Sequence, residues 1–170
     1  MSRHDEIAAG LADTERRIDE ACSAAGRDRS ELTLIVVTKT YPASDVDHLV
    51  DLGVAEVGEN RHPDAERTMT ELAGLRADLP RLHFLGGLQT NKAGAVARYA
   101  DTVHSVDRAK LARSLDRGAA AADRVLGCLV QVDFDATDPG RSGVVPDGVP
   151  ELTDLVASCE HLRLDGVMTV

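Results

Sequence analysis

Short apolar runs recur along the chain, and stretches with apolar residues at helical spacing separate them. The runs begin near residues 32, 55, 82, 102, 126 and 164. A continuous apolar run is typical of a strand that is buried on both faces of a parallel sheet. Helical spacing is seen over about residues 5–25, 42–53, 63–79, 93–97, 107–119 and 152–159. The pattern therefore predicts repeated strand–helix units and an α/β fold.

Strand–helix units that wind in one direction favour a (β/α)8 barrel, which usually needs about 250 residues. This chain has 170 residues, and its last apolar run, residues 162–170, ends the sequence. Six strands cannot close an eight-stranded barrel. We therefore expect one domain over residues 1–170, a barrel truncated before strands seven and eight. An open doubly wound sheet is the alternative, but no Gly-x-Gly-x-x-Gly motif follows the first run.

The charge and the cysteine content indicate which binding partners and which cellular compartment to expect. The formal net charge is −10, so neither nucleic acid nor a membrane surface is an expected partner. No apolar stretch is long enough to span a bilayer. The three cysteines, Cys22, Cys128 and Cys159, are scattered and odd in number, which fits reduced thiols in a cytoplasmic protein.

Lys39 is the first candidate for chemistry. It follows the apolar run Leu32 to Val37, so it is expected at the carboxyl end of a strand, where barrels and open α/β sheets carry their sites. Apolar surroundings disfavour the ammonium form of a lysine, and a neutral amine can form a Schiff base with an aldehyde. The alternative is a lysine that ends the strand and points into solvent.

Several linked motifs resemble the pyridoxal phosphate homeostasis proteins. They are Val37-Thr38-Lys39-Thr40, Gly58-Glu59-Asn60-Arg61, the stretch His83-Phe84-Leu85-Gly86-Gly87-Leu88-Gln89-Thr90-Asn91-Lys92, His104-Ser105-Val106-Asp107-Arg108 and Leu164-Asp165-Gly166-Val167-Met168-Thr169-Val170. They occur in the family's order over nearly the whole chain. The resemblance implies a TIM barrel of fold type III, similar to the N-terminal domain of alanine racemase.

The resemblance also implies a cofactor and its site. Pyridoxal 5'-phosphate is expected as a Schiff base on Lys39, with Asn60 and His83 near its ring and Met168 beside it. Gln89, Asn91 and Lys92 match the family's loop, and a structural role in capping and solvation is equally compatible with them. The family implies a carrier or regulator of the cofactor without turnover. Expected partners are the cofactor and apo-enzymes that require it, with the chain a monomer or weak homodimer.

Two departures from the family bear on cofactor binding. Arg141 stands where many relatives carry a lysine, and an arginine cannot take over an aldehyde. The phosphate-holding residues of the family come after its sixth strand, beyond Val170, so we expect this chain to bind the cofactor weakly. Gly86-Gly87 before a helix start can offer backbone N–H groups to an anion, although a structural turn is the favoured interpretation.

Other function classes remain open on the residues alone. A PLP-dependent racemase-like enzyme or a Schiff-base lyase of the aldolase type also uses a barrel lysine. A truncated fragment that docks its open sheet edge on a partner is a third class. A zinc hydrolase is disfavoured, because His83 and His104 belong to no His-x-His or His-x-x-x-His pair.

Overall fold

The computed structural model describes residues 2–135 and 142–170 of the protein. Its strands are β1 (Val36–Val37), β2 (Glu56–Glu59), β3 (Arg81–Phe84), β4 (Thr102–Val106), β5 (Leu126–Gln131) and β6 (Leu162–Met168). Its α-helices are α1 (Arg3–Ala25), α2 (Ala43–Asp51), α3 (Asp64–Leu75), α4 (Ala93–Val96), α5 (Ala109–Ala121) and α6 (Val149–Ser158). Short 3-10 turns are η1 (Arg29–Glu31), η2 (Thr90–Lys92) and η3 (Pro146–Gly148). None of the helices in the described ranges is long and apolar enough to cross a membrane.

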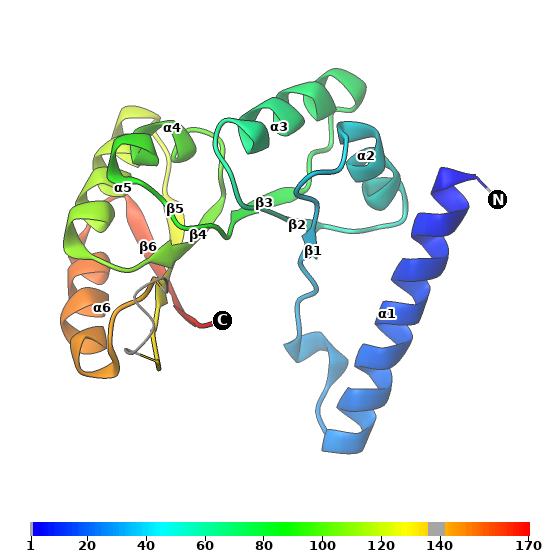
Figure 1. Cartoon of the computed structure of the whole chain (residues 1–170), viewed down its shortest axis with the longest axis horizontal. Coiled ribbons are helices and arrows are strands. Elements are labelled where there is room, and N and C mark those ends of the chain that lie inside the picture. Colours follow the sequence, from blue (N-terminus) through cyan, green and yellow to red (C-terminus); the bar gives the residue numbers. More distant parts are fainter. Residues whose placement is uncertain (1, 136–141) are drawn as a thin grey trace.

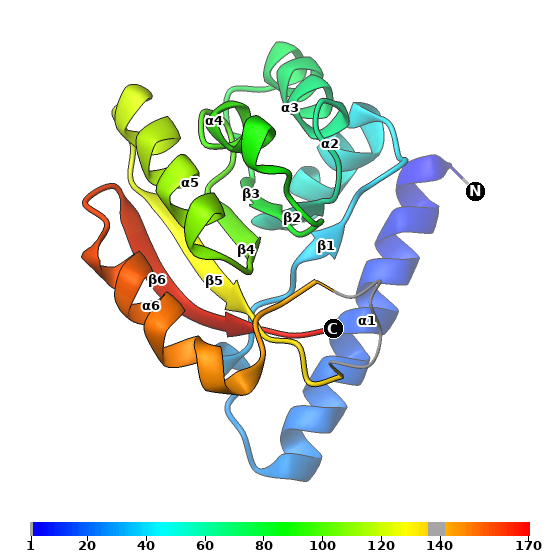
Figure 2. The same cartoon turned by 60° about the vertical axis from the view of Figure 1, so that its left-hand side comes forward.

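The strands form one parallel sheet in the order β1-β2-β3-β4-β5-β6, so each strand lies beside the one that precedes it in the chain. The sheet is curved, and Figure 1 shows α2 to α6 on its outer side and α1 beside β1 at one end. In Figure 2, β5 and β6 run side by side with α5 and α6 outside them. Within the described residues β1 and β6 do not pair with each other. The prediction of an incomplete (β/α) barrel is confirmed as this open, barrel-like sheet.

The core lies between the outer face of the sheet and the helices, in two apolar clusters. One cluster joins β3 to β5 with α4, α5 and α6, and Phe84, 1% exposed, is its aromatic member. The other joins α2, α3 and β2 around Val46, Val57 and Leu72, all at most 1% exposed. Tyr99 packs against both. Burial of this surface, worth roughly 25 cal/mol per Å², holds the helices to the sheet and fixes the strand ends.

The strand that precedes Lys39 is shorter and more exposed than predicted. The prediction of a strand over residues 32–37, buried on both faces, is wrong: only Val36–Val37 pair, and Val37 is 42% exposed. The physical reason is that β1 pairs with β2 alone and forms an edge of the sheet. An edge strand has no neighbour on its other side to complete its burial.

The start of α5 has no side-chain cap. Strand β4 continues through Val106, so Ser105 lies inside the sheet and is 1% exposed. Arg108 is the N-cap residue of α5, without a side-chain capping bond. A side-chain cap is a modest contribution, about 1 kcal/mol, and packing of the apolar face of α5 determines this helix instead.

Candidate functional site

A cavity of about 500 Å³ opens at the carboxyl ends of the strands. Residues from or just after all six strands line it: Val37, Lys39, Asn60, Leu85, Gly87, His104, Gln131, Ser142, Met168 and Val170. Three of the four predicted site residues, Lys39, Asn60 and Met168, therefore share one cavity, although they are far apart in sequence. Arg141 lies outside the residues that the structure describes.

Thr38 anchors the end of β1 to the end of β2. Its backbone N–H donates to Gly58 O at 2.9 Å, and its Oγ1 donates to Glu59 Oε1 at 2.8 Å. Thr38 and Glu59 are only 2% and 4% exposed. Burial raises the pKa of Glu59, while the bonds from Thr38 and from the Asn60 N–H oppose the shift. The residue before Lys39 is thus held by two bonds to the neighbouring strand.

A tight turn presents Lys39 itself. The Tyr41 N–H donates to Thr38 O at 3.0 Å, and Thr40 has φ of 72°. A β-branched residue in the left-handed region carries backbone strain of about 1–3 kcal/mol. The Lys39 side chain is exposed, and it lines both this cavity and a second one of about 560 Å³.

The loop after β3 passes close over Asn60. Leu85 N–H donates to Glu59 O at 2.7 Å, and a Cβ added to Gly86 would meet Asn60 O at 2.1 Å. Only a glycine permits that approach. Gly86 therefore has a structural reason to be glycine, which agrees with the turn interpretation made from the sequence.

The opposite wall is built from β5 and β6. Gln131, 6% exposed, donates from Nε2 to Ser142 O at 2.6 Å. Val132 N–H donates to Met168 O at 2.8 Å. These bonds to backbone oxygens hold Met168 and Ser142 at the same cavity as Lys39.

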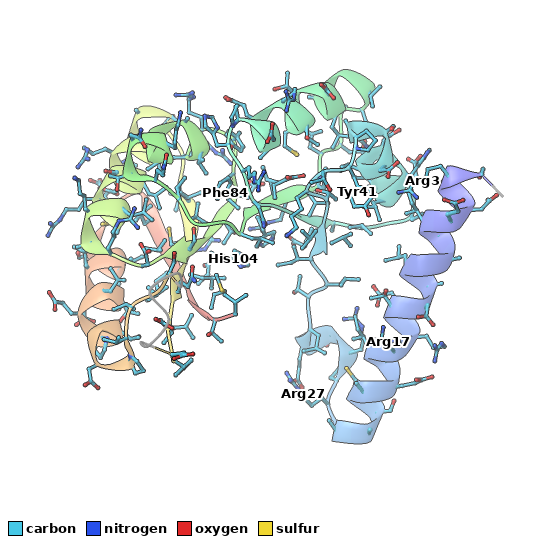
Figure 3. All side chains as sticks on the ribbon, viewed as in Figure 1. Arg3, Arg17, Arg27, Tyr41, Phe84 and His104 are labelled. Atoms are coloured by element: carbon cyan, nitrogen blue, oxygen red, sulfur yellow. The ribbon has the colours of Figure 1, made fainter. Side chains whose placement is uncertain are left out.

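His83 lies deeper in the sheet and is not among the residues that line the cavity. Its Nδ1 is 2.8 Å from His104 Nε2, and its Nε2 is 2.6 Å from Glu56 Oε2. His104 does line the cavity, so it connects His83 to it. Figure 3 shows Phe84 and His104 on opposite sides of the sheet, the helix side and the open side. Burial, with the nearby His83, lowers the pKa of His104 to about 4.

The loop that carries Gln89 and Lys92 lies beside this site. Both residues line a separate, smaller cavity of about 270 Å³, which also reaches Asn60. Arg108 holds the loop by donating from Nη2 to Leu88 O at 2.9 Å. Gln89 is the N-cap residue of η2 but makes no side-chain capping bond, so both interpretations of the loop residues stay predictions.

The cavity suits a small aromatic aldehyde. Its volume is in the range of small-molecule sites, and Val37, Leu85 and Met168 supply apolar contact for a flat ring. Asn60 and Gln131 supply amides, and Lys39 is the only lysine or arginine among the described residues that line it. In the described part of the chain, no group of three His, Cys, Asp or Glu side chains could hold a metal ion.

Sequence comparison finds one family over nearly the whole chain. The family described as alanine racemase, N-terminal domain, matches residues 14–170. The pyridoxal phosphate homeostasis protein of Mycobacterium tuberculosis is 38% identical, over 99% of this chain and 71% of the relative. Its namesakes in Corynebacterium glutamicum and Escherichia coli are 37% and 32% identical, over 92% and 98% of this chain and 71% and 70% of those proteins.

Solved structures agree in fold. A protein of unknown function from Bifidobacterium adolescentis has a TM-score of 0.86 and 30% identity, over 99% of this chain and 70% of that one. PipY of Synechococcus elongatus with PLP bound has a TM-score of 0.69 and 29% identity, over 90% of this chain and 70% of that one. Alanine racemase of Clostridium difficile, at 18% identity and a TM-score of 0.64 over 81% of this chain and 35% of its own, shares the fold. On these similarities, the chain belongs to the pyridoxal phosphate homeostasis protein family, with the fold of the alanine racemase N-terminal domain.

Proposed function

We propose that this protein binds pyridoxal 5'-phosphate at the strand-end cavity and takes part in homeostasis of that cofactor, with Lys39 as the attachment residue. The observation that carries the proposal is the convergence of Lys39, Asn60 and Met168 on one cavity in which Lys39 is the only lysine or arginine among the described lining residues. A relative at 29% identity, PipY, has been solved with PLP bound.

The cofactor supplies an aldehyde, which a neutral lysine amine attacks to form a Schiff base. The residues of the chain position this amine and contact the ring. Thr38, bonded to Gly58 and Glu59, fixes the backbone that carries the amine. Met168 and Leu85 give a ring apolar contact, and the Asn60 amide offers hydrogen bonds at the same cavity.

The proposal assigns a carrier without turnover of its own. The relatives in the comparison are named homeostasis proteins. Delivery of the cofactor to apo-enzymes and a cytoplasmic location belong to the same proposal; the three unpaired cysteines, two of them buried, support a reducing compartment. Racemisation of an amino acid, or cleavage of a carbon–carbon bond by the purified chain, would instead favour the racemase-like or lyase alternative.

The test is an absorbance spectrum of the purified chain with added pyridoxal 5'-phosphate, followed by borohydride reduction and peptide mass mapping. The sequence has only three lysines, Lys39, Lys92 and Lys110, so the map need distinguish only these and the terminal amine. We expect a visible absorbance band and a reduced adduct on Lys39.

Two variants make the result specific. Lys39→Arg keeps a positive charge but cannot form the bond, so band and adduct should both disappear. Lys92→Arg changes a lysine of the neighbouring loop and should leave both unchanged. Adducts spread evenly over Lys39, Lys92 and Lys110 would mean that the cavity does not select the cofactor.

A further inference from the structure

The open face of the sheet carries a row of three polar side chains beneath the Lys39 cavity. They are Glu56 on β2, His83 on β3 and His104 on β4, one from each neighbouring strand. The two ring contacts that join them measure 2.6 Å and 2.8 Å. The side chains of Glu56 and His83 are 20% and 11% exposed, and residue His104 is 8% exposed. The row starts at Glu56, the first residue of β2, and ends at the cavity. Of the three residues, only His104 lines the cavity.

The bonding pattern restricts where protons can sit. A carboxylate at Glu56 accepts, so Nε2 of His83 must donate to it. The second contact then has two possible forms. Either a neutral His83 accepts at Nδ1 from the Nε2–H of His104, or a protonated His83 donates from Nδ1 to Nε2 of His104. In both forms His104 is neutral, and only the nitrogen that carries its proton changes.

The charged groups around the two histidines of the row differ. Glu56 is the direct partner of His83, and Arg81 Nε lies 3.6 Å from the same carboxylate oxygen. Asp165 on β6 is the nearby acid that opposes the fall in the pKa of His104, but two bonds of 2.6 Å and 2.8 Å engage it with Arg163. Burial outweighs Asp165 and keeps His104 in its neutral form near pH 7.

The cavity at the end of the row also contains the Lys39 amine, which must lose a proton before it can react. Lys39 lines the same cavity as His104, and its amine reacts with an aldehyde only after it gives up the ammonium proton. The side chains of Asn60, Gln131 and Ser142, the other polar ones among the described lining residues, do not take up a proton near neutral pH. Among the described residues that line this cavity, His104 is therefore the one side chain other than Lys39 with a nitrogen that can accept a proton.

We propose that Glu56, His83 and His104 form a proton relay that takes the ammonium proton of Lys39 and returns it when water leaves; the role in cofactor attachment rests on the proposed function. One proton goes from Lys39 Nζ to His104 Nδ1, directly or through a cavity water. At the same time the Nε2 proton of His104 passes to His83 Nδ1. The imidazolium of His83 then rests against Glu56. The reverse shift supplies the proton that a departing hydroxyl needs, so the relay returns to its starting state.

The relay predicts a signature that simple packing does not. When the row takes up one proton, His104 changes from the Nε2–H to the Nδ1–H form without becoming an imidazolium, because Nδ1 of His83 then donates to it. Imidazole nitrogen shifts of the cofactor-free chain, labelled with nitrogen-15, report both forms. This measurement needs no cofactor, so it tests the relay even if the proposed function fails. A His104 ring that keeps one neutral form between pH 8 and pH 5 would overturn the proposal.

Removing the charge at the base of the row should shift this transition. Glu56→Gln retains an acceptor for His83 but no negative charge, so the change of form at His104 should occur at least about one pH unit lower. The matched control is Glu66→Gln, which removes a carboxylate 3.8 Å from another histidine, His62, outside the row. It should leave the transition of His104 where it is. An equal shift in both variants would mean that net charge, and not the relay, sets the transition.

The rate of Lys39 modification tests the connection to the cavity. His104→Gln can still donate to His83 but cannot pass a proton on. We expect borohydride-trapped pyridoxal 5'-phosphate on Lys39 to form at least about tenfold more slowly, with the final extent unchanged. If wild type shows no Lys39 adduct while the ring signature is present, the proposed function fails and the relay stands. If His104→Gln reacts at the wild-type rate from pH 6 to 9, the relay does not serve Lys39.

Discussion

At the scale of single residues, His104 makes the protein sensitive to acid. Its pKa of about 4 in the folded chain lies below the ordinary value of 6.5, so the unfolded chain binds this proton first as pH falls. The free energy of unfolding should therefore decrease between pH 6.5 and about 4, by at most about 3 kcal/mol from this group. His104→Gln should flatten that part of the profile, measured by urea unfolding at several pH values. His161→Gln, a half-buried histidine elsewhere, is the control, and an equally flat profile there would contradict the assignment.

The residues of the cavity were predictable to the extent that they mark the ends of apolar runs. Lys39 follows an apolar run, so the pattern alone places it at a strand end, whereas Asn60 and Met168 were expected from the family resemblance. The row beneath the cavity was missed because Glu56 and His83 lie inside strands. The signal that could have indicated the row is an isolated polar residue within a strand. Because alternate side chains face opposite sides of the sheet, such a residue can lie on the open face. The sequence cannot show which strands place two such residues within hydrogen-bonding distance.

At the scale of elements, the contact of α4 with α5 depends on a glycine. A Cβ on Gly118 would lie 2.8 Å from Gly94 Cα and 3.0 Å from the Ala97 Cβ. Gly118→Ala should therefore lower the free energy of unfolding by about 1–3 kcal/mol, although alanine favours helices. Gly10→Ala in α1, where a Cβ meets nothing within 4 Å, should instead raise it by about 0.5–1 kcal/mol. Urea unfolding measures both, and a stabilised Gly118→Ala variant would show that the helices can separate at little cost.

Helices and strands differ in how well their sequence patterns predicted them. All six α-helices in the described residues lie where the 3.6-residue period places them, and in all but the four-residue α4 the period persists for two turns or more. The strand before Lys39 was predicted too long, because an apolar run shows hydrophobicity but not the presence of a neighbouring strand. Val37 is apolar and still 42% exposed, since β1 is an edge.

At the scale of the whole molecule, the two apolar clusters divide the structure into two halves that are stabilised to different extents. The cluster around Phe84 includes β3 to β5 with α4, α5 and α6, whereas the other holds α2 and α3 to β2. β5 pairs with β6 over six positions, but β1 pairs with β2 over only two. Local opening costs least where few apolar contacts and few ladder bonds must break. The half that carries Lys39 is therefore the half expected to open first.

Amide hydrogen exchange tests this division. Peptides with Val36–Val37 should exchange well before peptides with Leu126–Gln131, because the former open without disturbing the larger cluster. Leu72→Ala, a change in the smaller cluster, should speed exchange in α2 and α3 and leave α5 near its wild-type rate. Leu115→Ala, the matched change in the larger cluster, should speed exchange in α5 and in β5. Uniform acceleration over the chain by both variants would show that Tyr99, which packs against both clusters, couples them into one cooperative unit. In that case cofactor attachment at Lys39 would stabilise α5, which has no residue among those that line the cavity, as much as β1, and the same exchange measurement with the cofactor bound would show it.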